Sequence, residues 1–422
     1  MNEATGLKKV LGLPQLVFYA VGVIVGAGIY SVIGAAAGIV GDGLWISFLI
    51  GALVALLTAL SYAEMATCLP LAGAEYVYLS RAFPGVAWAP FAMGILLIFG
   101  GAATAATVAM AFGGYLQGFL DMPPVLSGLV LLAGMTALAA AGLREAGIAN
   151  AVFTSIEVGG LLIVIAAGLH GGGVPALMPS GPAGLLPAAA LIFFVYLGFE
   201  EIANLAEEVR DPGRDLPRAI LLSLALTTLI YVAVALAVAA LADPAEMAES
   251  AAPLAMAVER VWPRVSGVLS AIALFATANT VLITLIAGAR MIFSMGRSGD
   301  LPGLFGRLSG GGVPIAASAA MLILAAALLP IANVRLLAEL SSFAALLAFL
   351  AVNVSLIVLR YRAPALARPF RVPFAIGRLP VLPAAALASI LILLVSFDAT
   401  VYAGGALALA LAFLAWKLRP AR

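Results

Sequence analysis

The stretch FFVYLGFEEIANLAEE, residues 193–208, places two adjacent carboxylates inside an otherwise apolar segment. A charge near the centre of a lipid bilayer is costly unless it faces a polar cavity or a partner. Neighbouring side chains on an α-helix point about 100° apart, so a regular helix cannot turn both Glu200 and Glu201 toward one cavity. The pattern predicts a membrane helix that unwinds after Gly198. The alternative is a shorter helix with Glu201 at its cytoplasmic mouth.

A second segment, VGVIVGAGIYSVIG at residues 21–34, carries four glycines within one apolar span. Glycine in a membrane helix usually permits close helix packing, but residues this small also leave the backbone free to unwind. This segment, which lies in the first predicted helix (helix 1), leaves both interpretations open when taken alone. Interrupted helices at corresponding places in two halves of a chain indicate a transporter with its substrate site near the bilayer midplane.

The composition of the whole chain supports a membrane protein. Of 422 residues, 64% are hydrophobic and 10% are charged, with a mean hydropathy of +1.18. A soluble domain carries about 25% charged residues, so most of this surface must face lipid. Polar and Pro/Gly punctuation divides the chain into about twelve spans of about 20 residues or more. The predicted spans are 12–39, 44–69, 86–120, 124–143, 148–169, 187–206, 217–241, 263–295, 314–329, 336–359, 380–397 and 400–416.

The distribution of cations tests this division independently. With the N-terminus in the cytoplasm, Arg260, Arg264 and Arg335 are the only ones of the 21 lysines and arginines that fall outside. Cytoplasmic loops of membrane proteins carry an excess of lysine and arginine. We therefore expect a multi-pass protein with both termini in the cytoplasm. The abundance of arginine, alanine and glycine is typical of GC-rich prokaryotes and suggests the inner cell membrane.

The order of the spans predicts one all-α integral domain over residues 1–422. The spans at 12–169 and 187–359 form two five-helix repeats of opposite orientation, because the first helix starts inside and the sixth starts outside. Two additional helices occupy 380–416. This repeat is inferred from position and hydropathy, since the halves share no convincing residue identity.

Four stretches resemble the amino acid–polyamine–organocation superfamily of permeases. They are GAGIY at 26–30, SYAEMATCLPLAGAEYVYLSRAF at 61–83, FFVYLGFEEIANLAEEVRDPGRDLPRAI at 193–220 and GARMIFSMGRSGDLP at 288–302. Each lies where the family has its own motif, and the third is highly specific. The resemblance implies a LeuT-like inverted repeat with two extra helices. It also implies transport of amino acids or related amines by alternating access.

A broken helix offers partners to both ends of an amino acid. The backbone N–H groups at the start of its second half suit a carboxylate, and the freed carbonyls suit an ammonium. We expect the amides in helix 1 and the carbonyls near Phe199 and Glu200 in helix 6. For the Phe199 ring there are two alternatives: it closes over the substrate, or it packs against the tenth predicted span at 336–359. The predicted substrate-binding residues are Gly26, Ala27, Gly28, Ile29, Phe199, Glu200 and Glu201.

A second candidate site joins helices 5 and 8. Helix 5 reads FTSIEVGGLL at 153–162, where sodium-independent members of the family resemble F-T-x-x-K. Glu157 reverses the charge of that lysine, so the lysine's role cannot be carried over. Three roles remain open for Glu157. It exchanges a proton during the transport cycle, it pairs with a bound cation or the substrate amine, or it only forms a hydrogen bond to a neighbouring helix. On helix 8, polar side chains either line this site or join helices. The predicted coupling residues are Glu157, Asn279, Thr280 and Thr284.

Charged and aromatic residues at the cytoplasmic end form a third group. Glu64 is expected to pair with Arg81 or with the charged linker at 207–218, which is a stabilising network or an inner gate. Tyr76 and Tyr78 follow helix 2 and are typical of interfacial aromatic residues, with a gating role as the alternative.

Other function classes lack their motifs. The chain has one histidine, one cysteine and no HExxH, GxSxG or Walker motif, which argues against an enzyme or an ATP-driven pump. The sequence contains no repeated pore loop, so it gives no indication of a channel. We expect a secondary active transporter, either a proton-coupled symporter or an amino acid/amine exchanger, with a channel or membrane enzyme as the distant alternative. The expected partners are the substrate, protons and the lipid bilayer, without metal, cofactor or nucleic acid.

Overall fold

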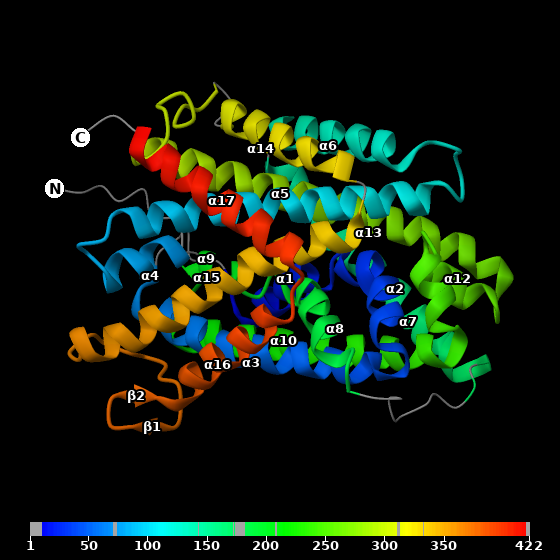
Figure 1. The fold of residues 1–422 in the computed structure, drawn as a ribbon, viewed down its shortest axis with the longest axis horizontal. Helices are drawn as coiled ribbons and strands as arrows, with labels where there is room; N and C mark the ends of the chain where they lie inside the picture. The colour runs from blue at the N-terminus through cyan, green and yellow to red at the C-terminus, as the bar shows by residue number, and fades with distance from the viewer. Residues whose placement is uncertain are drawn as a thin grey trace.

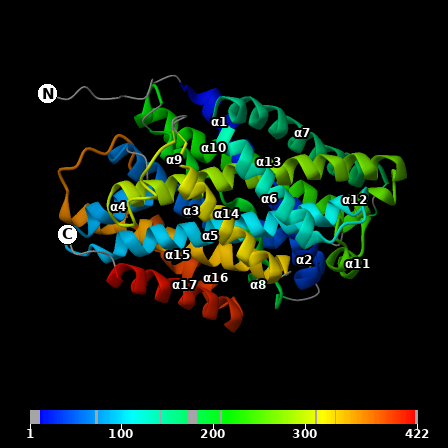
Figure 2. The ribbon, with the colours of Figure 1, turned by 90° about the horizontal axis from the view of Figure 1, so that it is seen from above.

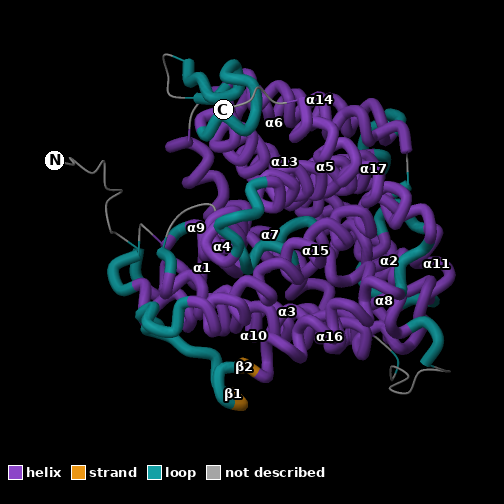
Figure 3. The backbone as a smooth tube through the Cα atoms, turned by 60° about the vertical axis from the view of Figure 1, so that its left-hand side comes forward, coloured by secondary structure: helices purple, strands orange, loops and turns teal. Residues whose placement is uncertain are grey.

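The computed structural model describes residues 11–70, 74–141, 143–171, 173, 182–206, 209–309, 313–331 and 333–418. Long helices lie alongside one another in a bundle (Figure 1). One two-stranded antiparallel hairpin, β1 (Ala375–Ile376) and β2 (Leu379–Pro380), projects from one end (Figure 3). Besides the helices introduced below, the bundle contains α6 (Pro124–Ala141), α7 (Leu143–Gly171), α11 (Pro244–Glu249), α12 (Pro253–Glu259), α14 (Ile315–Leu328), η4 (Leu329–Ile331) and α16 (Val381–Val395).

The helices have the length and surface of membrane spans. Within the described residues, eight segments are long and apolar enough to cross a bilayer, and four shorter apolar helices accompany them. The helix α17 (Ala399–Leu418) lies at the periphery (Figure 2) and exposes Leu407, Leu411, Phe413 and Leu414. Side chains of this kind suit lipid rather than water. The expectation of an all-helical, multi-pass membrane protein is confirmed.

The first predicted span is interrupted at its middle. Helix α1 (Leu13–Val25) ends before Gly26, and α2 (Gly28–Val40) begins two residues later. Gly26 adopts φ −35° and ψ −164°, which takes the backbone out of the helix. Of the two interpretations of the glycines in this span, unwinding is the one observed. The 3-10 turn η1 (Gly41–Gly43) then leads into α3 (Leu44–Cys68).

The sixth predicted span is interrupted as well. Helix α8 (Leu185–Ile192) tightens into the 3-10 turn η2 (Phe193–Tyr196), and the backbone is extended at Leu197. Gly198 has φ +120°, a conformation that side chains with a Cβ rarely adopt. The chain resumes as the single turn α9 (Glu201–Asn204). The interruption therefore begins one residue before the glycine at which the sequence placed it.

The two interrupted spans lie inside the bundle. Nearly all side chains of η2 and of the first turn of α2 are buried. Helices packed against them include α3, α5 (Trp88–Leu116), α7, α10 (Pro212–Leu241) and α15 (Val334–Arg362). Helix α13 (Pro263–Arg297) reaches the first break through Thr280. The short helix α4 (Ala74–Ala82) packs on α5 and α15 at the end of the bundle that carries the hairpin (Figure 1). We call this end of the molecule the α4 end.

Candidate functional site

The two helix interruptions face each other through glycines. A Cβ built on Gly198 would lie 3.1 Å from the carbonyl oxygen of Val23, and a Cβ built on Gly28 would lie 3.1 Å from the Cα of Val195. Both distances are tighter than most real Cβ contacts. Each break thus contains a glycine where the backbone of the other break approaches it.

Side chains from two other helices hold this arrangement. The Ala27 N–H donates to Thr280 Oγ1 of α13 over 2.8 Å. The Tyr231 hydroxyl of α10 lies 2.6 Å from the carbonyl oxygen of Ile24 and 3.2 Å from that of Val195. Because Ile24 belongs to α1 and Val195 to η2, one tyrosine contacts both interrupted spans. Tyr231 was missed in the sequence, although it is the only aromatic residue of its span.

A cavity of about 190 Å³ opens beside the two breaks. Its wall includes Glu75 of α4, Leu97 near the start of α5 and Met291 near the end of α13, so the cavity extends toward the α4 end. Among the predicted site residues, the wall includes Gly26, Gly28, Glu200, Glu201, Thr280 and Thr284. Ala27, Ile29, Phe199, Glu157 and Asn279 are not part of it.

Three acidic side chains lie on the cavity wall. Glu75, Glu200 and Glu201 line it, and the described wall contains no lysine, arginine or histidine. Glu200 Oε2 accepts from the Gly198 N–H over 2.8 Å, so this carboxylate also caps the backbone of its own break. An acidic wall without fixed cations favours a positively charged group in the cavity.

Glu75 is a cavity residue that the sequence did not single out. The Tyr62 hydroxyl donates to Glu75 Oε1 over 2.8 Å. Burial raises the pKa of the Glu75 carboxyl to about 7; the Tyr62 hydrogen bond opposes this shift, and the nearby Glu201 adds to it. A signal was available, because Glu75, Tyr78 and Leu79 recur at helical spacing and share a buried face of α4.

The Phe199 ring packs inside the bundle. Its centroid lies 5.7 Å from that of Tyr62 and 5.2 Å from that of Phe349 on α15. Of the two alternatives for Phe199, packing against the span predicted at 336–359, which is α15, is therefore the one seen in this conformation. The Phe199 and Glu200 carbonyls accept from the N–H groups of Ile202 and Ala203 in the first turn of α9.

The predicted coupling residues Glu157 and Asn279 meet between α7 and α13. Asn279 Nδ2 donates to Glu157 Oε1 over 3.2 Å, and the Tyr30 hydroxyl donates to the Glu157 backbone carbonyl over 2.9 Å. Glu157 is fully buried, and its Oε2 has no hydrogen-bond partner among the described residues. Thr280 follows Asn279 directly and reaches the break in helix 1, so this pair is one residue away from the cavity wall.

The expected partner of Glu64 was wrong. Arg360 Nε donates to Glu64 Oε1 over 3.0 Å, and Arg368 Nε lies 3.2 Å from the same oxygen. The Val372 N–H donates to Oε2 over 2.7 Å. Arg81, in contrast, is exposed at the end of α4. Sequence order favoured a nearby cation, whereas the fold brings the end of α15 to Glu64. In the predicted linker, residues 207–208 lie outside the described part of the chain.

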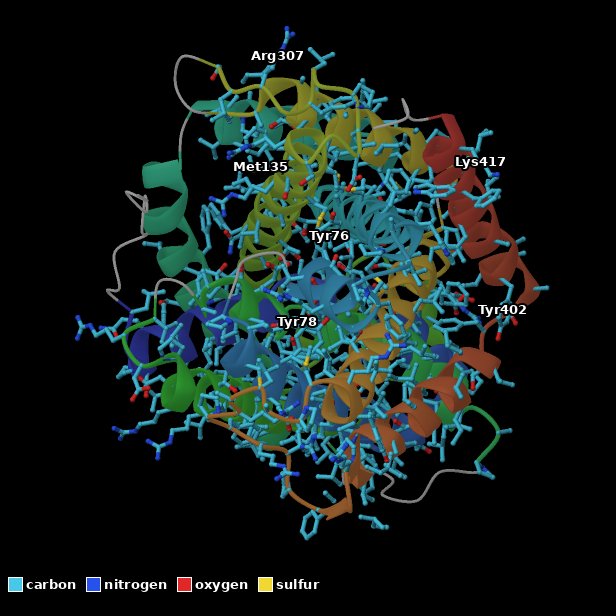
Figure 4. All side chains as sticks on the ribbon, turned by 90° about the vertical axis from the view of Figure 1, so that its left-hand side faces the viewer. Tyr76, Tyr78, Met135, Arg307, Tyr402 and Lys417 are labelled. Atoms are coloured by element: carbon cyan, nitrogen blue, oxygen red, sulfur yellow. The ribbon has the colours of Figure 1, made fainter. Side chains whose placement is uncertain are left out.

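The tyrosines of α4 differ from the interfacial aromatic residues that were expected. Figure 4 looks onto the α4 end and shows Tyr76 and Tyr78 at its centre, with Arg307 and Lys417 at the rim. The Tyr76 hydroxyl donates to Asp300 Oδ2 over 3.1 Å, and Tyr78 is fully buried with its ring against Tyr62. The interfacial interpretation is therefore wrong for Tyr78. Both residues fasten α4 to the bundle.

Comparison with known proteins identifies the family. The sequence profile described as amino acid permease matches residues 11–410. The branched-chain amino acid permease BcaP of Bacillus subtilis is 30% identical over 419 residues, which cover 92% of this chain and 88% of that protein. The methylthioribose transporter of the same organism is 30% identical over 407 residues, covering 90% and 87%. The vacuolar cationic amino acid transporter 4 of Arabidopsis thaliana is 31% identical over 386 residues, covering 85% and 64%.

The family match at residues 11–410 includes both interrupted spans, and the expected resemblance is confirmed. The chain belongs to the amino acid permease family of the amino acid–polyamine–organocation superfamily, and it is a transporter of amino acids or related solutes rather than an enzyme.

Proposed function

We propose that this protein is a secondary active transporter that binds an amino acid or related amine between its two interrupted helices. The observation that carries the proposal is the pair of facing breaks beside a cavity with an acidic wall. Under this proposal residues 12–169 and 187–359 are two inverted five-helix repeats, followed by two further helices at 380–416. Both termini lie in the cytoplasm of a prokaryotic cell.

The backbone of α2 supports a carboxylate subsite. The first N–H groups of a helix have no partner within it and carry the positive end of the helix dipole. The Ala27 N–H is already bonded to Thr280, so Gly28 and Ile29 supply the remaining donors. Gly28 lines the cavity, and the absence of a side chain there leaves the backbone accessible.

The carboxylates support a subsite for the amine. Glu200 and Glu201 lie on the cavity wall at the second break, so an ammonium can pair with a side chain as well as with a backbone carbonyl. The names of the relatives do not settle the substrate, because they refer to branched-chain amino acids, methylthioribose and cationic amino acids. The acidic wall favours a substrate with an exposed cationic amine.

The extent of the cavity toward the α4 end supports an inward-facing state. The cavity reaches Glu75, Leu97 and Met291 near the α4 end, which the positive-inside rule assigns to the cytoplasm. On the far side of the breaks, Tyr30 and Tyr115 pack edge to face with centroids 6.4 Å apart. Alternating access then requires the opposite side to open while the α4 side closes.

The test of this function is transport in proteoliposomes. A panel of radiolabelled amino acids and amines should show saturable uptake for a subset, and preloaded unlabelled substrate should accelerate entry of the label. Such counterflow is a property of a carrier with alternating access. Flux that rises linearly with concentration and shows no counterflow would contradict the proposal and favour a channel.

We place proton coupling at Glu157 within this cycle. Its carboxyl is fully buried, has one oxygen without a partner among the described residues, and is linked through Asn279 and Thr280 to the break in helix 1. The alternatives are coupling to a bound metal ion, a purely structural hydrogen bond, and exchange without net coupling.

Glu157→Gln separates these alternatives because it keeps the shape and removes the titration. Uptake by the variant should no longer respond to an imposed pH gradient, while counterflow exchange survives. The measurement is substrate accumulation in proteoliposomes with and without the gradient, with Glu249→Gln as an exposed control. If the Glu157 variant still concentrates substrate in response to the gradient, Glu157 is not the coupling site.

A further inference from the structure

A second cavity, remote from the helix interruptions, is lined mainly by arginine. It measures about 310 Å³ and lies at the α4 end, between the end of α15 and the connection to α16. No acidic side chain lines it within the described residues. The wall consists of Arg360, Pro364, Leu366, Arg368, Arg371 and Arg378.

Two of these arginines build the wall. Arg360 pairs with Glu64, and its Nη2 also donates to the Val372 carbonyl over 3.2 Å. Arg368 donates to carbonyls at the end of α15, including those of Leu359 and Ala363 at 3.1 and 3.2 Å. These bonds hold both guanidinium groups in fixed orientations beside the cavity.

The wall retains unused positive charge. Arg360 is only 3% exposed, yet its Nη1 has no hydrogen-bond partner among the described residues. A buried guanidinium nitrogen without a partner is costly and indicates a missing acceptor. Arg371 and Arg378 are exposed and form no ion pair in the described part of the chain. Of the four arginines on the wall, only Arg360 and Arg368 lie within ion-pair distance of a carboxylate in the described part of the chain, and both share that of Glu64.

The hairpin next to the cavity has apolar side chains on the outside. Phe374 is 73% exposed and Ile376 is 75% exposed, and both lie between Arg371 and Arg378 in the sequence. The apolar helix α16 starts at Val381, directly after the hairpin. Apolar side chains beside arginines at the end of a membrane helix are typical of the interface between lipid headgroups and acyl chains.

We propose that this arginine cavity binds a phosphate group. The guanidinium of Arg360, whose Nη1 has no partner among the described residues, forms part of the wall, and the exposed Arg371 and Arg378 supply the donors that an entering anion meets. Guanidinium groups recognise phosphate through paired charge-assisted hydrogen bonds, which distinguishes such a site from a diffuse positive surface. The exposed hairpin favours the headgroup of an anionic phospholipid over a free phosphate compound as the source of this group.

The test compares two double variants of the full chain that lose the same charge at the same end of the bundle. Arg371→Gln/Arg378→Gln removes the two exposed positive charges that line the arginine cavity. Arg297→Gln/Arg307→Gln removes two exposed arginines elsewhere, and Figure 4 shows Arg307 at the edge of the α4 end opposite the hairpin. All four positions are exposed, so neither variant is expected to unfold.

Binding is measured on purified protein in neutral detergent, with phosphatidylglycerol, phosphatidylcholine and inorganic pyrophosphate as separate probes. Phosphatidylglycerol should bind saturably to the unaltered protein and about tenfold more weakly to the Arg371/Arg378 variant, but unchanged to the control. The same pattern with pyrophosphate, without lipid binding, would support the phosphate site and assign it to a free compound. Two outcomes would overturn the proposal. One is that both variants bind the probe equally more weakly than the unaltered protein, and the other is that neither phosphatidylglycerol nor pyrophosphate binds saturably to the unaltered protein.

Discussion

At the scale of single residues, Gly28 combines close packing with access to the cavity. It lines the cavity, and a Cβ there would lie 3.1 Å from the Val195 Cα. Gly28→Val should abolish substrate binding, because the branched side chain would occupy the approach to the α2 amides and press on the second break. The measurement is binding of a transported substrate to purified protein, together with elution as a monodisperse peak.

Gly134 provides the matched control. It is an exposed helical glycine on α6, and a Cβ there would meet nothing within 4 Å. Gly134→Val should bind substrate like the unaltered protein. Unchanged affinity in the Gly28 variant would place the carboxylate subsite elsewhere.

Glu75 predicts a pH-dependent stability. Its pKa rises from the usual 4.5 to about 7 in the folded protein, mainly through burial. The folded state therefore holds this proton to a higher pH than the unfolded state does, so this group lowers stability as pH rises from about 4.5 to about 7. The loss is at most about 3 kcal/mol. Glu75→Gln stays neutral and should lose less stability than the unaltered protein between pH 5 and pH 8.

The measurement is the melting temperature in detergent at both pH values. Glu249→Gln, which changes an exposed carboxylate, should reproduce the pH profile of the unaltered protein. Parallel profiles for all three proteins would show that Glu75 has no raised pKa.

These residues also show what the sequence can predict at this scale. Gly28, Glu200 and Thr280 were predicted because glycine and polar groups are anomalous inside an apolar span. Tyr231 was missed because one tyrosine in a long helix looks ordinary until the fold surrounds it. Glu75 was missed because the segment that follows the span at 44–69 was not recognised as a helix with a buried face. Burial by distant segments is a tertiary property that local composition does not carry.

At the scale of elements, the interruption of helix 1 depends on a side chain from another helix. Thr280 accepts the Ala27 N–H, which has no partner within α2. Thr280→Val keeps the shape and removes the acceptor, which should destabilise the protein by about 1–3 kcal/mol. The melting temperature should fall by several degrees, and substrate affinity should weaken because the α2 amides lose their support.

Thr284 is one turn away on the same helix and also lines the cavity, but its hydroxyl makes no hydrogen bond among the described residues. Thr284→Val should therefore change stability far less than Thr280→Val. Equal losses in the two variants would mean that the Thr280 bond to the break contributes nothing specific.

The positions of the helix breaks were more predictable from the sequence than the partners of the charged residues at the helix ends. The breaks in helices 1 and 6 follow from glycine content and adjacent carboxylates, both of which are local. The partner of Glu64 was mispredicted because Arg360 lies 296 residues further along the chain, and no local pattern relates the two. Long-range pairing of charged helix ends requires the fold itself.

At the scale of the whole molecule, the distribution of cations predicts which ends face the cytoplasm. Glu249 and Ala375 are exposed, and the predicted topology places them on opposite sides of the membrane. In a Cys68→Ala background, an impermeant thiol reagent added to intact cells should label Glu249→Cys and leave Ala375→Cys unlabelled. Permeabilised cells should label both. The reverse pattern in intact cells would invert the topology.

The contacts of Tyr231 connect the two halves of the molecule in a further way. Its hydroxyl carries a single hydrogen but lies within bonding distance of two carbonyls, one in α1 and one in η2. The two carbonyls share this one hydrogen, so a change at one break alters the hydrogen bond that the other break receives. Substitutions at the two breaks should then be non-additive, and the coupling energy between them should shrink once Tyr231 is replaced by phenylalanine. Tyr231 thus links two interrupted spans that lie about 170 residues apart in the chain.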